Sequence, residues 1–588
     1  MNEIEPKELR FKSGTNILNY IRQFSATEKV IFGLFAVMAF VTALIMVIKV
    51  NDNFSIEVPA VGGTLNEGVI GLPRSINPIL AVTDIDRDLS TLVYSGLMKF
   101  SDGKMTTDLA RSYKVSDDGL IYTFTLKPKI TFQDGSALTT EDVAFTVKKI
   151  QDPTLKSPRR IDWANVTVKI ISSSEIQFIL KQPYSPFLTN TTIGIVPKHI
   201  WGDVSDEQFI FSQYNTSPIG SGIYKVTSVS HDNGGIPTKY TLESWRGYYG
   251  SKPFIPTIIF SFFSDESSAL SALDQGNIDS LSSVSPEVAA KLVTDVAQSY
   301  KIISAPLPRV FGIFFNQNQS IVLADKVVRQ ALDMSIDRQT LINNVLKGYG
   351  VAIHGPVPFI ASTSSPITAI KTTTSSSMVK LSQIESAQIL LEKNSWQKGA
   401  DGIYFKKNVK TGNTILAFDI FTADSPDFRQ TAELVKSFWT KLGAKVSIKI
   451  YETNDLYQNI IRTRKYDALL FGEAIGKDRD LYAFWHSSQR NSPGLNIAMY
   501  ANSKADKLLE EIRAASNEDI RATKYSQFDQ IIRADIPAIF LYSPDFIYAV
   551  PKLVQNITLG SITTPSDRWN SVTKWYRQTE KVWKIFTK

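Results

Sequence analysis

The chain has 588 residues, of which 43% are hydrophobic and 21% charged, a composition typical of globular proteins and a length that predicts about two to four domains. It contains no cysteine, which excludes disulfides, thiol nucleophiles, thiolate metal sites and a lipid-bearing cysteine anchor. The net charge of +7 is spread along the chain beside acidic residues, so the charge pattern does not favour a nucleic-acid partner.

The first predicted element is an apolar stretch without a charge from Val30 to Ile48. As a helix that rises ~1.5 Å per residue, this stretch covers nearly the whole ~30 Å hydrocarbon core of a membrane. A cleaved signal peptide is the alternative, but the preceding polar segment is long and no small-residue cleavage site follows closely. We therefore predict an uncleaved transmembrane anchor at 30–48.

Basic residues predict the orientation of this anchor. The apolar stretch is preceded by basic residues that include Arg10, Lys12, Arg22 and Lys29, whereas only Lys49 follows it closely. Because positive charge stays on the cytoplasmic side, residues 1–29 are expected in the cytoplasm. A linker at 49–54 then leads to an extracytoplasmic body, so that the protein is predicted to be a single-pass protein of the cell membrane.

After the anchor, short strands alternate with helices, as in a mixed sheet covered by helices. Tyr122, Phe124 and Leu126 alternate with threonines and predict a strand. Thr139 and Asp142 have the spacing of a capping box, which predicts that a helix begins there. The segment VTVKIISSSEIQFIL predicts two strands around a serine turn, and the serine- and threonine-rich tract 361–377 predicts an exposed loop.

Two consecutive helices are predicted in DKVVRQALDMSIDRQTLINNVLKGYG, where Asp337 caps the second helix and Gly348 ends it. No fixed-period repeat is present, which argues against solenoids and propellers. We find none of the common nucleophile, zinc-protease, phosphate-binding or dinucleotide-binding motifs. The histidines lack metal-ligand spacing: His199, His231, His354 and His486. We therefore predict no catalytic residue, no metal site and no cofactor.

Eleven segments, in order, resemble one family. They are GGTLNEGVIGLPRSINPIL, LVYSGLMKF, DLARSYKVSDDGLIYTFTLKPKITFQDGSALTTEDVAFTV, IVPKHIW, SPIGSGIYKV, SALDQGNIDSL, FFNQN, DKVVRQALDMSIDRQTLI, DGIYF, FWHSSQRNSPGLNIAMY and AIFLYSP. The chain resembles solute-binding protein family 5, the extracellular oligopeptide-, dipeptide- and nickel-binding proteins of ABC importers. The similarity covers most of the predicted body.

This resemblance implies an α/β, two-lobed type II periplasmic-binding-protein fold, a clamshell with an inserted subdomain, preceded here by one transmembrane helix. Mapped by motif, lobe I takes residues 55–85, 217–308 and 541–588, the insert takes 86–216 and lobe II takes 309–540. The crossings between lobes are expected near PRVFGIFFN and AIFLYSP, which we predict to be hinge strands.

The function implied is a membrane-anchored receptor that closes over a peptide or other small solute and delivers it to the permease subunits of an ABC importer. The protein is expected to act as a monomer and not as an enzyme. Two alternatives stay open, a ligand sensor that is not coupled to transport and an extracellular hydrolase, although no hydrolase motif is present.

The segment from Gly472 to Ser488 is the main site candidate. Family members commonly read G-W-x-x-D-x-x-D-P here, with an aspartate for the ligand's ammonium group. Gly472 matches, Glu473 stands where tryptophan is common, and Asp478 is the better candidate for that aspartate. Pairing of Asp478 with Lys477 or Arg479 in solvent is its alternative. We interpret Asp480 as the structural aspartate of the D-P pair.

Large aromatic residues pack in cores more often than they line sites, so Trp485 is a candidate for the cleft wall with core packing as the favoured alternative. His486 is interpreted as a structural residue. The complete set of predicted ligand-binding residues is Glu67, Gly68, Val69, Tyr94, Asn316, Gly472, Glu473, Ala474, Asp478, Asp480 and Trp485.

Overall fold

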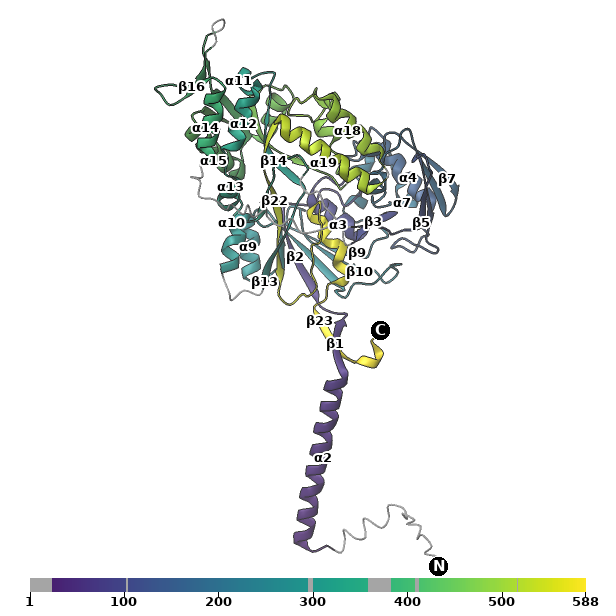
Figure 1. Ribbon diagram of the computed structural model, residues 1–588. Helices are drawn as coiled ribbons and strands as arrows, with labels where there is room; N and C mark the ends of the chain where they lie inside the picture. The colour runs from purple at the N-terminus through teal and green to yellow at the C-terminus, as the bar shows by residue number, and fades with distance from the viewer. Residues whose placement is uncertain are drawn as a thin grey trace, which may run out of the picture. The chain divides into compact units, whose positions relative to one another are not determined.

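The computed structural model describes residues 24–101, 104–294, 300–357, 382–407, 412–477, 479–515 and 517–587. The predicted loop at 361–377 and residue Asp478 lie outside these ranges, as does most of the predicted cytoplasmic segment. Contacts within the chain define two units, one of residues 1–61 with 578–588 and one of residues 62–577. We call them the anchor unit and the body (Figure 1).

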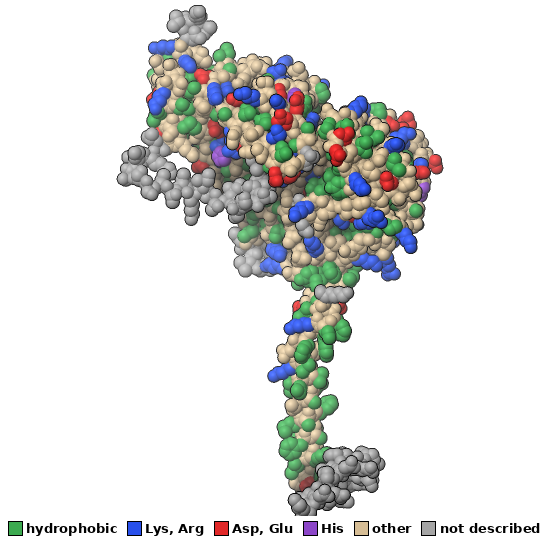
Figure 2. Space-filling model, turned by 45° about the vertical axis from the view of Figure 1, so that its right-hand side comes forward, with side chains coloured by type: hydrophobic (Ala, Val, Ile, Leu, Met, Phe, Trp, Pro, Cys, Tyr) green, Lys and Arg blue, Asp and Glu red, His purple; other side chains and the backbone are tan. Residues whose placement is uncertain are grey.

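The anchor unit contains helix α2 (Ala26–Phe54), strand β1 (Ser55–Ala60), strand β23 (Gln578–Trp583) and the short helix η5 (Lys584–Phe586). A capping box between Ser25 and Glu28 begins α2. The mean hydropathy of its most apolar window is 2.8 and none of that window is buried; Figure 2 shows apolar side chains along its length. The helix is long and apolar enough to cross a membrane, a property that a signal sequence shares.

The body is built on a twelve-stranded sheet in the order β20-β19-β21-β14-β22-β12-β2-β11-β10-β9, with β13 and β15 also paired to β22. The strand bounds are β2 (Thr64–Ile70), β9 (Tyr224–His231), β10 (Pro237–Ser244), β11 (Thr257–Phe263), β12 (Ser280–Ser282), β13 (Tyr300–Pro306), β14 (Arg309–Phe315), β15 (Gly350–Ala352), β19 (Ala417–Ala423), β20 (Lys445–Tyr451), β21 (Ala468–Ala474) and β22 (Ala538–Pro551).

Two separate sets of hydrophobic core residues share this sheet. One set lies between Leu65 and Leu307 and continues from Phe546 onward. The other set lies between Val310 and Tyr542. We call these parts lobe I and lobe II. Strand β22 belongs to both, because it pairs with β14 and β15 near its start and with β12 and β13 near its end. The lobe and insert boundaries given above stay predictions.

Helices cover the sheet, and smaller sheets lie beside it (Figure 1). One small sheet has the order β5-β6-β8-β7 and another pairs β3 with β4. The bounds are β3 (Met98–Ser101), β4 (Lys104–Thr107), β5 (Ala110–Val115), β6 (Ile121–Leu126), β7 (Val166–Ser172), β8 (Glu175–Leu180), α3 (Asp84–Val93), α4 (Thr140–Gln151), α9 (Glu266–Asp274), α10 (Pro286–Thr294), α12 (Lys326–Met334), α13 (Arg338–Val345), α14 (Gln383–Lys393), α15 (Pro426–Leu442), α17 (Tyr482–Trp485), α18 (Ser503–Ala514) and α19 (Glu518–Asp535).

Several local predictions are confirmed. The alternating residues Tyr122, Phe124 and Leu126 are the buried positions of β6. Thr139 is the N-cap of α4, and its side chain and that of Asp142 form the predicted capping box. Asp337 accepts hydrogen bonds from two backbone N–H groups at the start of α13. These signals act within one turn of a helix or along one strand, so the sequence alone is enough to specify them.

Candidate ligand-binding site

The end of strand β21 leaves part of its main chain without a strand partner. Gly472, Glu473 and Ala474 pair with β14 on one side. On the other side, β19 pairs only with the earlier residues Ala468 and Leu469. Within the described ranges, no other strand pairs with this second edge. An open edge of this kind can hydrogen-bond the main chain of an extended ligand without reading its side chains.

Strand β2 of lobe I has a similar open end. Strand β11 pairs with β2 along its whole length. On the other side, β12 pairs only with Glu67 and Gly68, so Val69 and Ile70 have one edge that no strand of the described ranges occupies. A side chain at Gly68 would collide with Ile278, since an added Cβ would lie 2.3 Å from it. Of the predicted residues Glu67, Gly68 and Val69, it is Val69 whose main chain has an edge without a strand partner in the described ranges.

Glu473 is a buried carboxyl group without a hydrogen-bond partner. Its side chain is 3% exposed, and neither oxygen makes a hydrogen bond to the described residues. Burial raises the pKa of Glu473 well above its ordinary value of 4.5, while the nearby Trp485 indole opposes this rise. Trp485 is fully buried, yet its N–H does not reach hydrogen-bond geometry. Burial therefore favours the neutral form of the Glu473 carboxyl group, which lies beside the Trp485 indole.

Glu67 lies in a buried charge cluster of lobe I. Its side chain is fully buried, and it accepts hydrogen bonds from Ser280, from Tyr548 at 2.7 Å and from Arg568 at 3.0 Å. Burial raises the pKa of Glu67, while Arg568 opposes the rise. All of these contacts are to the protein itself. The contacts of the Glu67 side chain do not support a role in ligand binding, and this role stays a prediction.

Arg568 is the centre of that cluster and was not singled out by the sequence analysis. Its guanidinium is fully buried and donates to both carboxylate oxygens of Asp88, at 2.9 and 2.6 Å, as well as to Glu67 and the Pro565 carbonyl. Burial also raises the pKa of Asp88, and Arg568 opposes that rise. The two carboxylates raise the pKa of Arg568 against the effect of burial, so the cluster favours a charged guanidinium.

A small pocket lies between the two lobes. It has a volume of about 70 Å³ and is lined by Phe100, Pro308, Gly476, Lys477, Arg479, Ser561, Ile562, Thr563, Asp567 and Asn570. Lys477 of lobe II forms an ion pair with Asp567 of lobe I. Its ammonium group also lies 5.0 Å from the centre of the Phe100 ring. Asp567 is fixed by the N–H groups of Thr563 and Thr564.

A second set of contacts joins the lobes. The Ser185 N–H donates to the Arg513 carbonyl at 3.0 Å, and Arg521 donates to the Ser185 hydroxyl at 2.8 Å. The Arg513 guanidinium lies 3.8 Å from the centre of the Tyr482 ring and also pairs with Asp480 at 2.6 Å. The Asp480 carboxylate is therefore held inside lobe II, which fits the structural role predicted for it.

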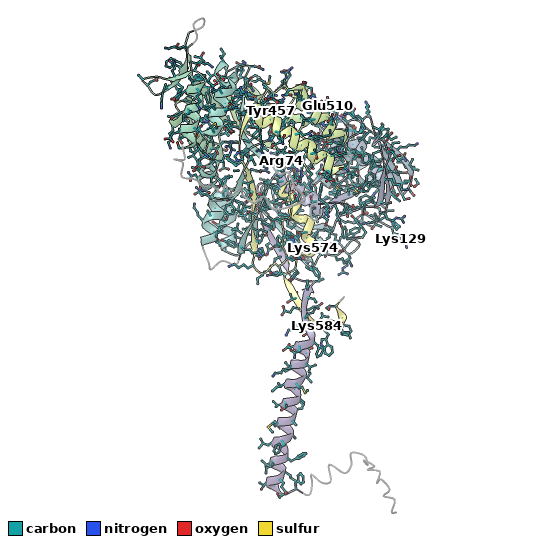
Figure 3. The ribbon with its side chains drawn as sticks, viewed as in Figure 1. Arg74, Lys129, Tyr457, Glu510, Lys574 and Lys584 are labelled. Carbon is teal, nitrogen blue, oxygen red and sulfur yellow. The ribbon has the colours of Figure 1, made fainter. Side chains whose placement is uncertain are left out.

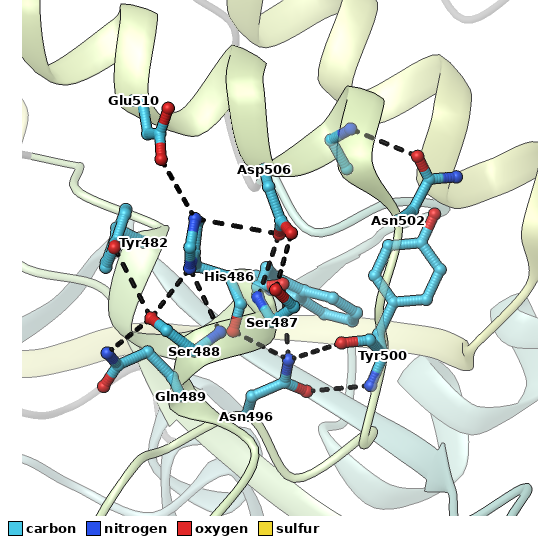
Figure 4. Close-up of polar contacts among 12 residues, drawn as sticks. Tyr482, His486, Ser487, Ser488, Gln489, Asn496, Tyr500, Asn502, Asp506 and Glu510 are labelled. Carbon is cyan, nitrogen blue, oxygen red and sulfur yellow. Dashed lines mark hydrogen bonds and ion pairs between the residues drawn. The ribbon is translucent and has the colours of Figure 1, made fainter.

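His486 takes part in a local hydrogen-bond cluster (Figure 4). Its Nδ1 accepts from the Ser488 backbone N–H at 3.1 Å and lies 2.8 Å from the Ser488 hydroxyl. Its Nε2 lies 3.5 Å from Glu510 and 3.9 Å from Asp506, and makes no hydrogen bond within the described ranges. Asp506 instead accepts from the N–H and hydroxyl of Ser487. The Ser488 contact caps the short 3-10 helix η3 (Ser487–Gln489), of which His486 is the N-cap.

The remaining candidates lie in packed surroundings. Tyr94 is 4% exposed, its hydroxyl has no partner within the described ranges, and burial raises its pKa. Asn316 is 1% exposed, and its side chain donates to the Arg464 carbonyl and accepts from the Asn318 N–H. Gly472 packs against the Phe311 ring, 3.1 Å from where a Cβ would lie. The structure brings Glu473 and Trp485 together and leaves Tyr94 and Asn316 apart from them.

Two lobes on a shared sheet, open strand edges in each lobe and a pocket lined from both define a two-lobed binding protein. Residues 104–494 match the family described as bacterial extracellular solute-binding proteins, family 5 Middle. The chain belongs to this family.

Relatives agree with this assignment. The chain is 28% identical to the oligopeptide-binding protein AppA of Bacillus subtilis, over 88% of this chain and 92% of that protein. It is 23% identical to the dipeptide-binding protein of Escherichia coli, over 84% and 91% of the two chains.

Solved structures share the fold. The structure of AppA from Bacillus subtilis in complex with a nonapeptide is 27% identical, with a TM-score of 0.65, and the match covers 89% of this chain and all of that one. NikZ from Campylobacter jejuni in complex with Ni(L-His) is 26% identical with a TM-score of 0.67, over 87% and 99% of the two chains. The predicted α/β periplasmic-binding-protein fold is confirmed.

Proposed function

We propose that this protein is a membrane-anchored extracytoplasmic receptor that binds a peptide between its lobes and delivers it to an ABC importer. The observation that carries the proposal is the similarity, over almost the whole body, to a binding protein whose structure holds a nonapeptide. The open main-chain edges at Gly472–Ala474 and Val69–Ile70 support an extended ligand. The apolar helix α2 supports the anchor.

In this proposal, the peptide's amino end is recognised by more than a contact between a carboxylate of the protein and the ammonium group of the ligand. The Glu473 carboxyl group can accept a hydrogen bond and, in the protonated form that burial favours, can also donate one. The Trp485 indole beside it has no hydrogen-bond partner within the described ranges. Lys477 lines the pocket between the lobes, where it forms an ion pair with Asp567. These groups favour ligands that bring carbonyl or carboxylate oxygens to this end of the site. Asp478 stays a candidate for an ammonium group.

Closure of the lobes is the proposed signal to the permease. Ligand contacts on both lobes favour the closed form, and no bond is made or broken. The Lys477–Asp567 pair and the Ser185–Arg521 contact are contacts that such a closed form uses. A sensor shares this ligand step, and pull-down of permease subunits from the native membrane distinguishes the two roles.

The proposal is tested on the full chain in detergent or nanodiscs. We expect native mass spectrometry to detect a co-purified small molecule, and members of a peptide library of mixed length to raise the unfolding temperature. A ligand at 100 times its Kd stabilises the folded state by about 2.7 kcal/mol. Hydrolysis of a peptide by the protein, or the absence of any peptide effect together with binding of an unrelated solute, would overturn peptide reception.

Removal of the ion pair between the lobes is expected to weaken ligand binding. Lys477→Ala removes this ion pair from the closed form. Solvent screens the pair only in part, since Lys477 is 25% and Asp567 7% exposed. We expect a loss of about 1 to 2 kcal/mol, or about five- to thirtyfold in Kd, measured by titration calorimetry. Lys198→Ala is the control, because it removes an exposed pair with Glu141 far from Asp567 in sequence. An unchanged Kd in Lys477→Ala would show that the pair is absent from the bound form.

A further inference from the structure

The C-terminal segment folds back onto the end of the apolar helix. Strand β23 pairs with β1 in antiparallel register, which places Trp583 opposite Ser55, the first residue after α2. The Trp583 indole N–H donates to the Asn51 side chain at 2.7 Å, and its ring lies 6.5 Å from that of Phe54. Lys581 pairs with Asp52 at 2.8 Å. The tail is therefore fixed to the last turn of the helix by side chains as well as by the main chain.

These contacts determine the position of Trp583 along the axis of α2. Asn51 lies three residues beyond Ile48, the end of the uncharged apolar run, and this corresponds to a rise of about 4.5 Å. The hydrocarbon core is ~30 Å thick, and the headgroup regions add about 5 to 8 Å on each side. If α2 spans a membrane, Trp583 lies in the headgroup region, which is where tryptophan is enriched in membrane proteins.

The residues after Trp583 expose apolar surface next to basic groups. Ile585 is 81% and Phe586 77% exposed, and both belong to η5, none of whose residues is buried. Lys584 precedes them, close to the junction of α2 and β1 (Figure 3). Adjacent large apolar side chains in water are unfavourable and typically mark a contact surface, while lysines near anionic headgroups favour binding to the membrane surface.

We infer that residues 578–587 form a second membrane contact, in which Trp583, Ile585 and Phe586 insert into the outer interface of the bilayer beside α2. The occupant is the lipid surface. Its apolar boundary matches Ile585 and Phe586, and its headgroups match Trp583 and Lys584. This inference rests on the proposed anchor. It adds that the C-terminal segment and the last turn of α2 meet at one depth of the membrane, so that the anchor is held by the β1–β23 strand pair and the helix together.

The absence of cysteine makes a direct test possible. A nitroxide label is attached at Ile585→Cys in the full chain, in nanodiscs of zwitterionic and anionic lipid. The measurement is the ratio of its collision rate with oxygen to that with a water-soluble nickel chelate. We expect this ratio to be several-fold higher than for a label at Ile161→Cys, a residue of similar exposure at 88%. Trp583→Ala in the Ile585→Cys chain is expected to shift this ratio toward that of Ile161→Cys.

A third label separates the two proposals. Val41→Cys lies within the apolar run of α2 and reports the anchor alone. If Val41→Cys is in lipid while Ile585→Cys gives the aqueous ratio of Ile161→Cys, the tail contact is overturned and the anchor stands. If Val41→Cys is itself in water, the anchor fails and the tail contact fails with it.

Discussion

Replacing Arg568 by methionine is expected to lower the free energy of unfolding by about 3 to 5 kcal/mol, because it leaves two buried carboxylates without their cation. Glu67, Asp88 and Arg568 are all 2% exposed or less. The guanidinium joins strand β2, helix α3 and the first residue of the 3-10 helix η4 (Pro565–Lys574) through four hydrogen bonds. Urea unfolding at pH 7 measures the change.

A matched control is Arg429→Met, which removes an arginine–aspartate pair with both side chains about half exposed and is expected to have little effect. The triple variant Glu67→Gln, Asp88→Asn, Arg568→Met removes the uncompensated charges together with the cation, so most of the lost stability is expected to return. A loss of less than about 1 kcal/mol in Arg568→Met would mean that the cluster is open to water and does not hold lobe I together.

Replacing Glu473 by glutamine is expected to remove a pH dependence of folding. Burial raises the pKa of Glu473 well above 4.5, so between the unfolded and the folded pKa the folded state binds the additional proton. Stability contributed by this group is therefore fully present below pH 4.5 and is lost as the pH rises toward the folded pKa. The loss is about 1.4 kcal/mol for each pH unit within this window. Glutamine carries no such proton.

Glu473→Gln and the wild-type chain should therefore have similar stability near pH 4, with the variant increasingly more stable as the pH rises from 4.5 toward the folded pKa of Glu473. Urea unfolding at a series of pH values measures both curves. Glu433→Gln is the control, since Glu433 is 65% exposed and its replacement should leave the wild-type pH dependence in place. Parallel curves for Glu473→Gln and wild type would contradict a buried neutral carboxyl group.

Local signals made much of the fold predictable. The capping residues Thr139 and Asp337 and the alternation around Phe124 specify their elements within a few neighbouring residues. The apolar run at 30–48 predicted the helix that the structure has as α2. The assignment to a two-lobed fold came from resemblance, since the pairing of β22 with strands of both lobes depends on residues hundreds of positions apart.

The candidate site was less predictable for the same reason. Arg568 meets Glu67 and Asp88 across separations of 501 and 480 residues, and no motif in its own segment marks it as a buried cation. Lys477 appeared in the sequence only as a neighbour for Asp478, yet the structure pairs it with Asp567. The departure from the family pattern at Glu473 was visible in the sequence, whereas the burial of its carboxyl group, without a hydrogen-bond partner within the described ranges, depends on the packing of lobe II.

Strand β22 has a consequence for the energetics of the whole body. Its fourteen residues form ladders with strands of both lobes, and Ser543, near the change of partners, is fully buried and donates to the Leu307 carbonyl at 2.5 Å. Unfolding of one lobe therefore removes hydrogen bonds from β22, a strand that is also part of the other lobe. We therefore expect the two cores to unfold as a single cooperative unit and not as independent folding domains.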